Sequence, residues 1–91
     1  MKFDISIHGR GGHASRPDNS INPLDCFVAV LAAMESMGRC EITRVDGGTA
    51  SNIIPNTVRF EGTLENADKA QIQTVVDSLC EAYGCRCEYH S

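Results

Sequence analysis

Gly-Arg-Gly-Gly-His-Ala-Ser-Arg-Pro, residues 9–17, separates a segment with the periodicity of a strand from one with the periodicity of a helix. Glycine has no Cβ, so it suits backbone at positive φ and places where the main chain approaches another group closely. The imidazole of histidine titrates near neutral pH and can donate or accept a proton in catalysis. The stretch therefore predicts a shaped loop that presents His13. The alternative is a glycine-rich turn with an incidental solvated histidine.

The residues before this loop alternate between apolar and polar types. Phe3, Ile5 and Ile7 stand on one side of the alternation in residues 2–8, and polar or charged residues stand on the other. This period of two predicts a half-buried strand. His8 falls on the polar side, where we expect a solvated histidine at the strand end.

A helix is predicted to begin at Asn22 and Pro23 and to end at Gly38. Asparagine suits the N-cap, and proline suits the first helical position because its missing N–H would have no partner there. Glycine is common where helices stop. We expect the apolar face of this helix to consist of Leu24, Phe27, Val28, Leu31 and Met34.

Two further strands are predicted after this helix. Residues 40–46 carry several charges, as edge strands often do. Residues 49–56 are expected to be irregular, because Pro55 cannot donate to a central ladder. Residues 57–64 form the next strand, with Gly62 as a bulge or a point of close contact. The inward-facing residues of this strand are expected to be Val58, Phe60 and Leu64.

A second helix and a last strand complete the chain. Asn66 is expected to cap the helix, with Asp68 in its first turn, where a negative charge suits the helix dipole. Gly84 ends the helix, and residues 85–89 form the strand. The apolar stripe of this helix is expected to be Ile72, Val75, Val76, Leu79 and Tyr83.

The order of these elements is β-α-β-β-α-β. It predicts an α+β fold, a ferredoxin-like two-layer sandwich with a four-stranded antiparallel sheet and two helices on one face. Right-handed crossovers put the first and third strands in the middle of the sheet and the second and fourth at its edges. Residues 1–91 are long enough for one domain of this kind.

The composition limits the classes of binding partner that we expect. The net charge is −4 and the pI is about 5.2, so no basic surface favours nucleic acid or an anionic membrane. The longest apolar run covers residues 26–34, far short of a membrane span. The odd cysteine count of five favours reduced thiols and a cytoplasmic protein.

Two sets of residues could form a chemical site, or could simply belong to the core. Cys80, Cys85, Cys87 and His90 lie close in sequence, but they lack the usual spacing of zinc ligands, so core cysteines are the preferred interpretation. A nucleophilic pair of Cys26 with His13 is a further alternative. The chain has no GxSxG motif and no P-loop, so catalysis by these residues alone is not expected.

Two glycine-rich segments are stronger candidates for a functional site than these cysteines. Gly11-Gly12-His13 follows the first predicted strand, and Gly47-Gly48, with Asn52 nearby, follows the second. Each segment could present a polar side chain at an end of the sheet, an imidazole in one case and a carboxamide in the other. Such groups suit a carbonyl oxygen or a carboxylate, as in an oxyanion-type contact.

Several separated motifs resemble those of a known family. Residues 9–17 are followed by Asn-Pro-Leu at a helix start, by Gly-Gly-Thr-Ala-Ser-Asn-Ile-Ile-Pro-Asn at 47–56 and by Phe-Glu-Gly-Thr-Leu at 60–64. In this order they closely resemble the dimerisation (lid) domain of the aminoacylase and carboxypeptidase family of dizinc metallopeptidases. The nearest subgroup is the N-acyl-amino-acid amidohydrolases, such as hippurate hydrolase and indole-acetyl-amino-acid hydrolase.

The resemblance implies that residues 1–91 are a single domain excised from a larger two-domain metallohydrolase. Members of the family hold two divalent metal ions, typically zinc, in a separate catalytic domain, together with a bridging water and a glutamate base. None of the family's metal-ligand motifs is present in this sequence. The resemblance therefore implies that the fragment holds no metal or other cofactor and is inactive alone.

The resemblance also assigns roles to particular residues. His13 matches the family histidine that reaches an active site, often that of the partner subunit, polarises the scissile carbonyl and stabilises the oxyanion. Asn52 matches an asparagine that helps bind a carbonyl or carboxylate of the substrate. Gly11-Gly12 and Gly47-Gly48 shape the two loops around that substrate.

The partners implied by the resemblance are a second copy of the chain, the catalytic domain and a small-molecule substrate. Family dimers form through the first helix and the second, edge strand. The substrate would be an N-acyl amino acid or a small peptide, cleaved at its amide bond. The alternative is a stand-alone ferredoxin-like dimeric module that binds a small ligand or regulates without chemistry.

Overall fold

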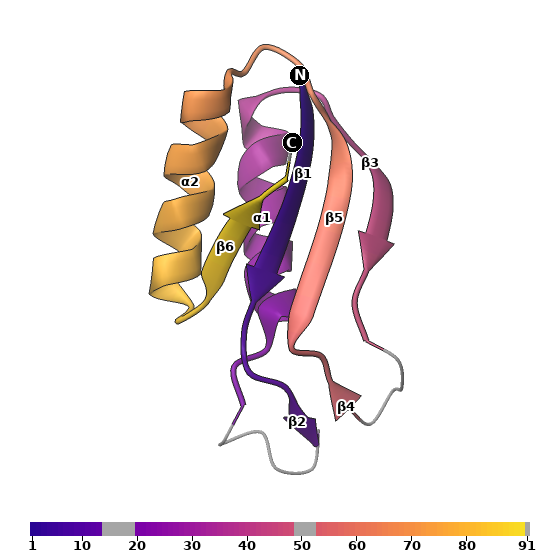
Figure 1. The fold of residues 1–91 in the computed structure, drawn as a ribbon. Helices are drawn as coiled ribbons and strands as arrows, with labels where there is room; N and C mark the ends of the chain where they lie inside the picture. The colour runs from indigo at the N-terminus through magenta and orange to yellow at the C-terminus, as the bar shows by residue number, and fades with distance from the viewer. Residues whose placement is uncertain (14–19, 49–52, 91) are drawn as a thin grey trace.

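The computed structural model describes residues 1–13, 20–48 and 53–90. Both helices lie on one face of the main sheet (Figure 1), and its strand order is β3-β5-β1-β6 with antiparallel pairing throughout. The predicted α+β sandwich is confirmed, with the first and third predicted strands in the middle. The elements are β1 (Lys2–His8), β2 (Gly12–His13), α1 (Pro23–Met37), β3 (Cys40–Asp46), β4 (Ile53–Ile54), β5 (Thr57–Leu64), α2 (Lys69–Ala82) and β6 (Arg86–Tyr89).

The core lies between the helices and the two central strands. The alternation predicted for β1 is confirmed, since Phe3, Ile5 and Ile7 are all buried. Phe60 on β5 is fully buried. Its ring centroid lies 5.9 Å from that of Phe3, in an edge-on arrangement, and 4.8 Å from that of Phe27. These aromatic contacts join both central strands to α1, in addition to the apolar area that they bury.

Helix α1 begins as predicted, and its buried face includes part of the predicted one. The Asn22 side chain accepts a hydrogen bond from the backbone N–H of Leu24 at 3.0 Å, and Pro23 occupies the first turn. The buried face includes Cys26, Val30 and Met34, whereas Val28, predicted inward, is 65% exposed. Leu24 and Phe27, which were also predicted, are partly buried against the core. The prediction is wrong for Val28, because this helix is apolar on several sides and periodicity does not single out one face.

Helix α2 begins later than predicted. Asp68, not Asn66, is the N-cap: its side chain accepts from the backbone N–H of Gln71, and the Gln71 side chain accepts from the backbone N–H of Asp68. This capping box satisfies two helix donors reciprocally, which a single cap at Asn66 could not do. Asn66 instead adopts a left-handed turn conformation, with φ at 63°.

The far end of α2 stops where predicted. Gly84 has φ at 73°, and the N–H groups of Gly84 and Cys85 donate back to the carbonyls of Glu81 and Cys80. This is the Schellman arrangement, which favours glycine because of its left-handed backbone. Tyr83, predicted to join the apolar stripe, is 44% exposed, because the helix ends before its side chain reaches the core.

Gly62 on β5 is a point of close contact, as predicted. A Cβ at this position would lie 2.2 Å from the carbonyl oxygen of Glu41 and 2.8 Å from the ring of Phe3. The register of β3 shifts opposite this glycine, between Ile42 and Arg44. The irregularity therefore lies in the edge strand, while β5 itself stays continuous.

Candidate functional site

The two predicted glycine-rich loops contribute short strands that pair at one end of the sheet. β2 and β4 pair as a separate two-stranded sheet, Gly12 with Ile54 and His13 with Ile53, and project beyond one end of the main sheet (Figure 1). We call residues 12–13 and 53–54 the β2–β4 ribbon. The prediction that residues 49–56 are irregular is wrong at Ile53–Ile54, because a two-residue strand carries no detectable periodicity. Pro55 follows the ribbon directly, outside β4, where its missing N–H removes no hydrogen bond from the ladder.

The segment that leads into the ribbon is closely packed. A Cβ at Gly9 would lie 2.2 Å from the carbonyl oxygen of Ile21 and 2.9 Å from the ring of Pro23. A Cβ at Gly11 would lie 2.4 Å from the carbonyl oxygen of Ile54. Both glycines therefore allow backbone contacts that any side chain would prevent.

Asn56 joins this segment to the start of β5, and sequence reasoning assigned it no role. Its backbone carbonyl accepts from the N–H of Gly9 at 2.8 Å. Its side-chain Oδ1 accepts from the N–H of Gly11, also at 2.8 Å. The only signal in the sequence was its place after Pro55, within the motif quoted above.

The structure places the segment that carries His13 beside the segment that begins at Ile53. The backbone of His13 pairs with Ile53, the residue that follows Asn52 in the chain. Asn52 itself lies outside the described residues.

The remaining predicted glycines differ in their surroundings. The nearest atom to a Cβ at Gly12 would be the Cβ of Ser20 at 3.6 Å, an ordinary contact. Gly47 lies against Val58, where a Cβ would be 3.0 Å from Cγ2. Gly48 has φ at 89° and open space around it. Glycine is therefore favoured at position 48 by the positive φ of the backbone, and at position 47 by the close packing against Val58. Their predicted role in substrate binding, like that of Gly11 and Gly12, stays a prediction.

His8 is held by two partners and is not simply solvated, contrary to expectation. Its Nδ1 lies 2.9 Å from Oγ1 of Thr57, and its Nε2 lies 2.9 Å from Oε1 of Glu88. A carboxylate only accepts, so in the neutral ring Nε2 donates and Nδ1 accepts the threonine hydroxyl. The hydrogen bond from His8 lowers the pKa of Glu88. His8 thus ties β1 to both neighbouring strands.

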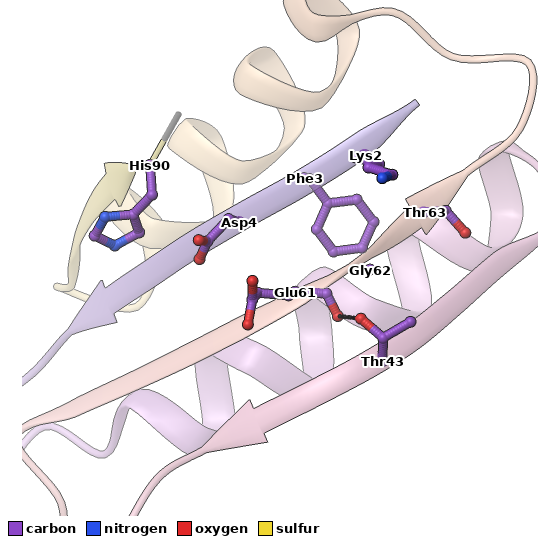
Figure 2. Close-up of a pocket in the computed structure, with 8 residues that line it drawn as sticks. All are labelled: Lys2, Phe3, Asp4, Thr43, Glu61, Gly62, Thr63 and His90. Carbon is purple, nitrogen blue, oxygen red and sulfur yellow. Dashed lines mark hydrogen bonds between the residues drawn. The ribbon is translucent and has the colours of Figure 1, made fainter.

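The open face of the sheet carries a hollow of about 440 Å³ near the start of β1. Figure 2 shows its lining, which includes Lys2, Asp4, Glu61 and His90. These side chains carry charges of both signs, so the hollow presents no single field to a ligand. It lies beside the first residues of β1, whereas the β2–β4 ribbon follows the last ones.

The structure separates His90 from the cysteines of the zinc alternative. Nε2 of His90 contacts Oγ of Ser6 at 2.7 Å on the open face, whereas Cys80 is buried in the core on the helix side. The thiol of Cys87 also lies on the helix side, 2.9 Å from Oδ1 of Asp77. Within residues 1–13, 20–48 and 53–90, no three histidine, cysteine or acidic side chains converge as a metal site would require.

The thiol of Cys26 is a core group. It is fully buried and lies 3.7 Å from the sulfur of Cys80, across the contact between α1 and α2. Burial raises the pKa of Cys26 to about 11, so the thiol stays protonated near neutral pH. A thiol in that state is a poor nucleophile, which argues against the Cys26 and His13 pair.

Neither described helix is long and apolar enough to cross a membrane.

Comparison with known proteins gives a consistent match. A family model described as a peptidase dimerisation domain matches residues 1–83. The chain is 30% identical to an N-acetylcysteine deacetylase of Bacillus subtilis, over 97% of this chain and 28% of that protein. It is also 30% identical to thermostable carboxypeptidase 2 of Saccharolobus solfataricus, over 94% of this chain and 26% of that one.

Solved structures share the fold. The aminopeptidase PepT from Bacillus cereus superposes with a TM-score of 0.79 at 22% identity, over 98% of this chain and 27% of that one. The present chain thus spans under a third of each of these proteins.

Proposed function

Because this chain belongs to the peptidase dimerisation domain family, we propose that it is the dimerisation and lid domain of a metal-dependent amidohydrolase. The observation that carries this proposal is the β2–β4 ribbon, which holds the backbone of His13 against the segment that follows Asn52. The curated relatives are a deacetylase and a carboxypeptidase. We therefore infer hydrolysis of an amide bond in an N-acyl amino acid or a small peptide.

His13 would act on the scissile carbonyl. An imidazole N–H donates a hydrogen bond to the carbonyl oxygen, and the bond strengthens as negative charge develops on that oxygen in the tetrahedral intermediate. The carboxamide of Asn52 would hold a second carbonyl or the carboxylate of the substrate. We propose that His13 serves the active site of the partner subunit, as the family resemblance implies.

The metal ions would be held by the catalytic domain. In the described part of this chain, no three potential metal ligands converge. We propose two divalent ions, zinc by the family resemblance. Bound there, they would supply a nucleophilic water at neutral pH and polarise the carbonyl.

The dimer would form through α1 and β3. β3 is an edge strand whose outer side has no partner within the described residues. α1 exposes Val28 at 65%, and β3 exposes Val45 at 44%. An unpaired edge strand together with exposed apolar side chains favours pairing with a second copy across a two-fold axis.

We also propose a cytoplasmic location, where the free thiols would stay reduced.

The test is His13→Ala in the full-length protein that carries this domain. Loss of one oxyanion donor is expected to lower kcat by roughly 10²- to 10³-fold, while the unfolding midpoint changes little. Release of free amino acid from N-acetyl amino acids and dipeptides measures the rate. His90→Gln is the matched control, because glutamine can still bond Ser6 on the open face of the main sheet, and neither residue belongs to the ribbon.

A kcat for His13→Ala within a few-fold of the His90→Gln control would refute the role of His13. Absence of any hydrolysis by the full-length protein, with metal supplied, would favour the stand-alone ligand-binding module instead.

A further inference from the structure

We propose that Asn56 is a positioning residue that sets the register of the β2–β4 ribbon and so places the strand carrying His13. The inference rests on the proposed function for the role of His13. Its structural part concerns described residues only and can be tested separately.

Two ladders meet at Asn56 with different registers. The ladder between β1 and β5 pairs His8 with Thr57 and continues through the hydrogen bond from Gly9 to the carbonyl of Asn56. The ribbon ladder then begins with Gly12 opposite Ile54. Two residues of the first segment therefore stand against one residue of the second. This is the arrangement of a β-bulge, a feature over-represented next to active sites.

The bulge is held from both sides. Arg10 turns away from the ladder and exchanges two backbone hydrogen bonds with Ile21, at 2.7 and 2.8 Å, just before α1 begins. Gly11 turns toward Asn56 and donates its N–H to Oδ1 at 2.8 Å. Extending the ribbon register would place Pro55 opposite Gly11. The Gly11 N–H instead donates to the side chain of Asn56, so a side-chain oxygen supplies the acceptor that a backbone carbonyl would supply in a regular ladder.

The close approach leaves little freedom for another arrangement. A Cβ at Gly11 would lie 2.8 Å from Oδ1 of Asn56 and 2.4 Å from the carbonyl oxygen of Ile54. A one-residue change of register moves every position of a strand to the other face. The bulge therefore decides which face of the ribbon each position occupies, and Asn56 is the side chain that holds it.

The test compares three variants of the full-length protein. Asn56→Ala removes the acceptor for Gly11, and Asn56→Asp keeps an oxygen acceptor at the same place. Asp68→Ala is the matched control, because it removes an equivalent side-chain bond to a backbone N–H, 2.8 Å long, at the far end of the sandwich (Figure 1). Hydrogen–deuterium exchange of peptides covering residues 9–13 and 53–56 reports on the ribbon, and hydrolysis of an N-acetyl amino acid reports on His13.

For Asn56→Ala, we expect exchange in the ribbon peptides to rise roughly two- to tenfold, the effect of one lost hydrogen bond. We expect kcat to fall roughly tenfold to a hundredfold with a much smaller change in KM, because a misplaced group acts on the chemical step. Asn56→Asp is expected to restore both values to near the parent. Asp68→Ala is expected to leave the ribbon exchange and kcat unchanged.

Unchanged ribbon exchange in Asn56→Ala would overturn the inference, whatever the activity. Faster exchange with unchanged kcat, in a protein where His13→Ala is impaired, would also overturn it, because the register would then not position His13. A full-length protein without hydrolase activity would refute the proposed function, while the exchange measurements would still decide whether Asn56 holds the ribbon.

Discussion

Gly62→Ala should destabilise the sheet where β5 meets the edge strand β3. The added Cβ would lie 2.2 Å from the carbonyl oxygen of Glu41, about 1 Å inside the closest contact that such atoms tolerate. It would also lie 2.8 Å from the ring of Phe3. The ring can rotate away, but the carbonyl belongs to the β3 backbone, which pairs with β5 at this point.

The cost follows from these contacts. Overpacking by one methyl group costs about 1–3 kcal/mol, and displacing the Glu41 backbone loses one ladder hydrogen bond, worth about 1 kcal/mol. The free energy of unfolding should therefore fall by about 2–4 kcal/mol. For a domain of this size, that corresponds to a loss of roughly 10–20 °C in Tm.

Urea unfolding followed by circular dichroism measures the change. Gly12→Ala is the matched control, because its Cβ would meet only the Cβ of Ser20 at 3.6 Å, and its stability should stay within about 0.5 kcal/mol of the parent. A Gly62→Ala protein that unfolds at the same urea concentration as Gly12→Ala would refute the reasoning. It would mean that β3 moves aside at no cost.

The remaining predictions concern pH and assembly. Arg59 donates to both carboxylate oxygens of Asp4, at 2.9 and 2.7 Å, and holds the pKa of Asp4 below its usual 3.8. The ionised carboxylate therefore stabilises the fold above that pH, and this contribution is lost as the pH falls through the lowered pKa. Urea midpoints measured from pH 6 down to pH 3 should fall less steeply for Asp4→Asn, and an identical slope would contradict this account. Val28→Glu and Val45→Glu should each shift the proposed dimer toward monomer in sedimentation velocity. Tyr83→Glu, which also replaces an exposed large hydrophobic side chain, should not. Dimers that persist in both valine variants would place the interface elsewhere.

Much of the sandwich could be predicted from local patterns. Phe3, Ile5 and Ile7 alternate with polar residues, and a period of two has only one face that can be buried. Asn22 before a proline marked the start of α1, because both residues suit positions where helix N–H groups lack partners. The exposed Val28 shows the limit of this approach. A helix that is apolar on several sides acquires a buried face only when the sheet and α2 pack against it.

The candidate site divides in the same way. His13, Asn52 and the loop glycines could be named from motifs within single stretches of sequence. The ribbon that brings residue 13 to residue 53 could not, because a two-residue strand exists only through its partner. The role of Asn56 was equally invisible, since its side chain bonds Gly11, far away in the chain.

The sequence alone was sufficient to predict the order of the main helices and strands and the buried faces of the long strands, because these depend on short-range patterns of hydrophobicity, capping and turn residues. The family was indicated by the resemblance of separated motifs. Tertiary contacts decide which residues of α1 are buried, where the register of β3 shifts and how the two loops join. Each of these depends on contacts between residues distant in sequence, where a single close approach at Gly11 or Gly62 selects one register over its neighbour.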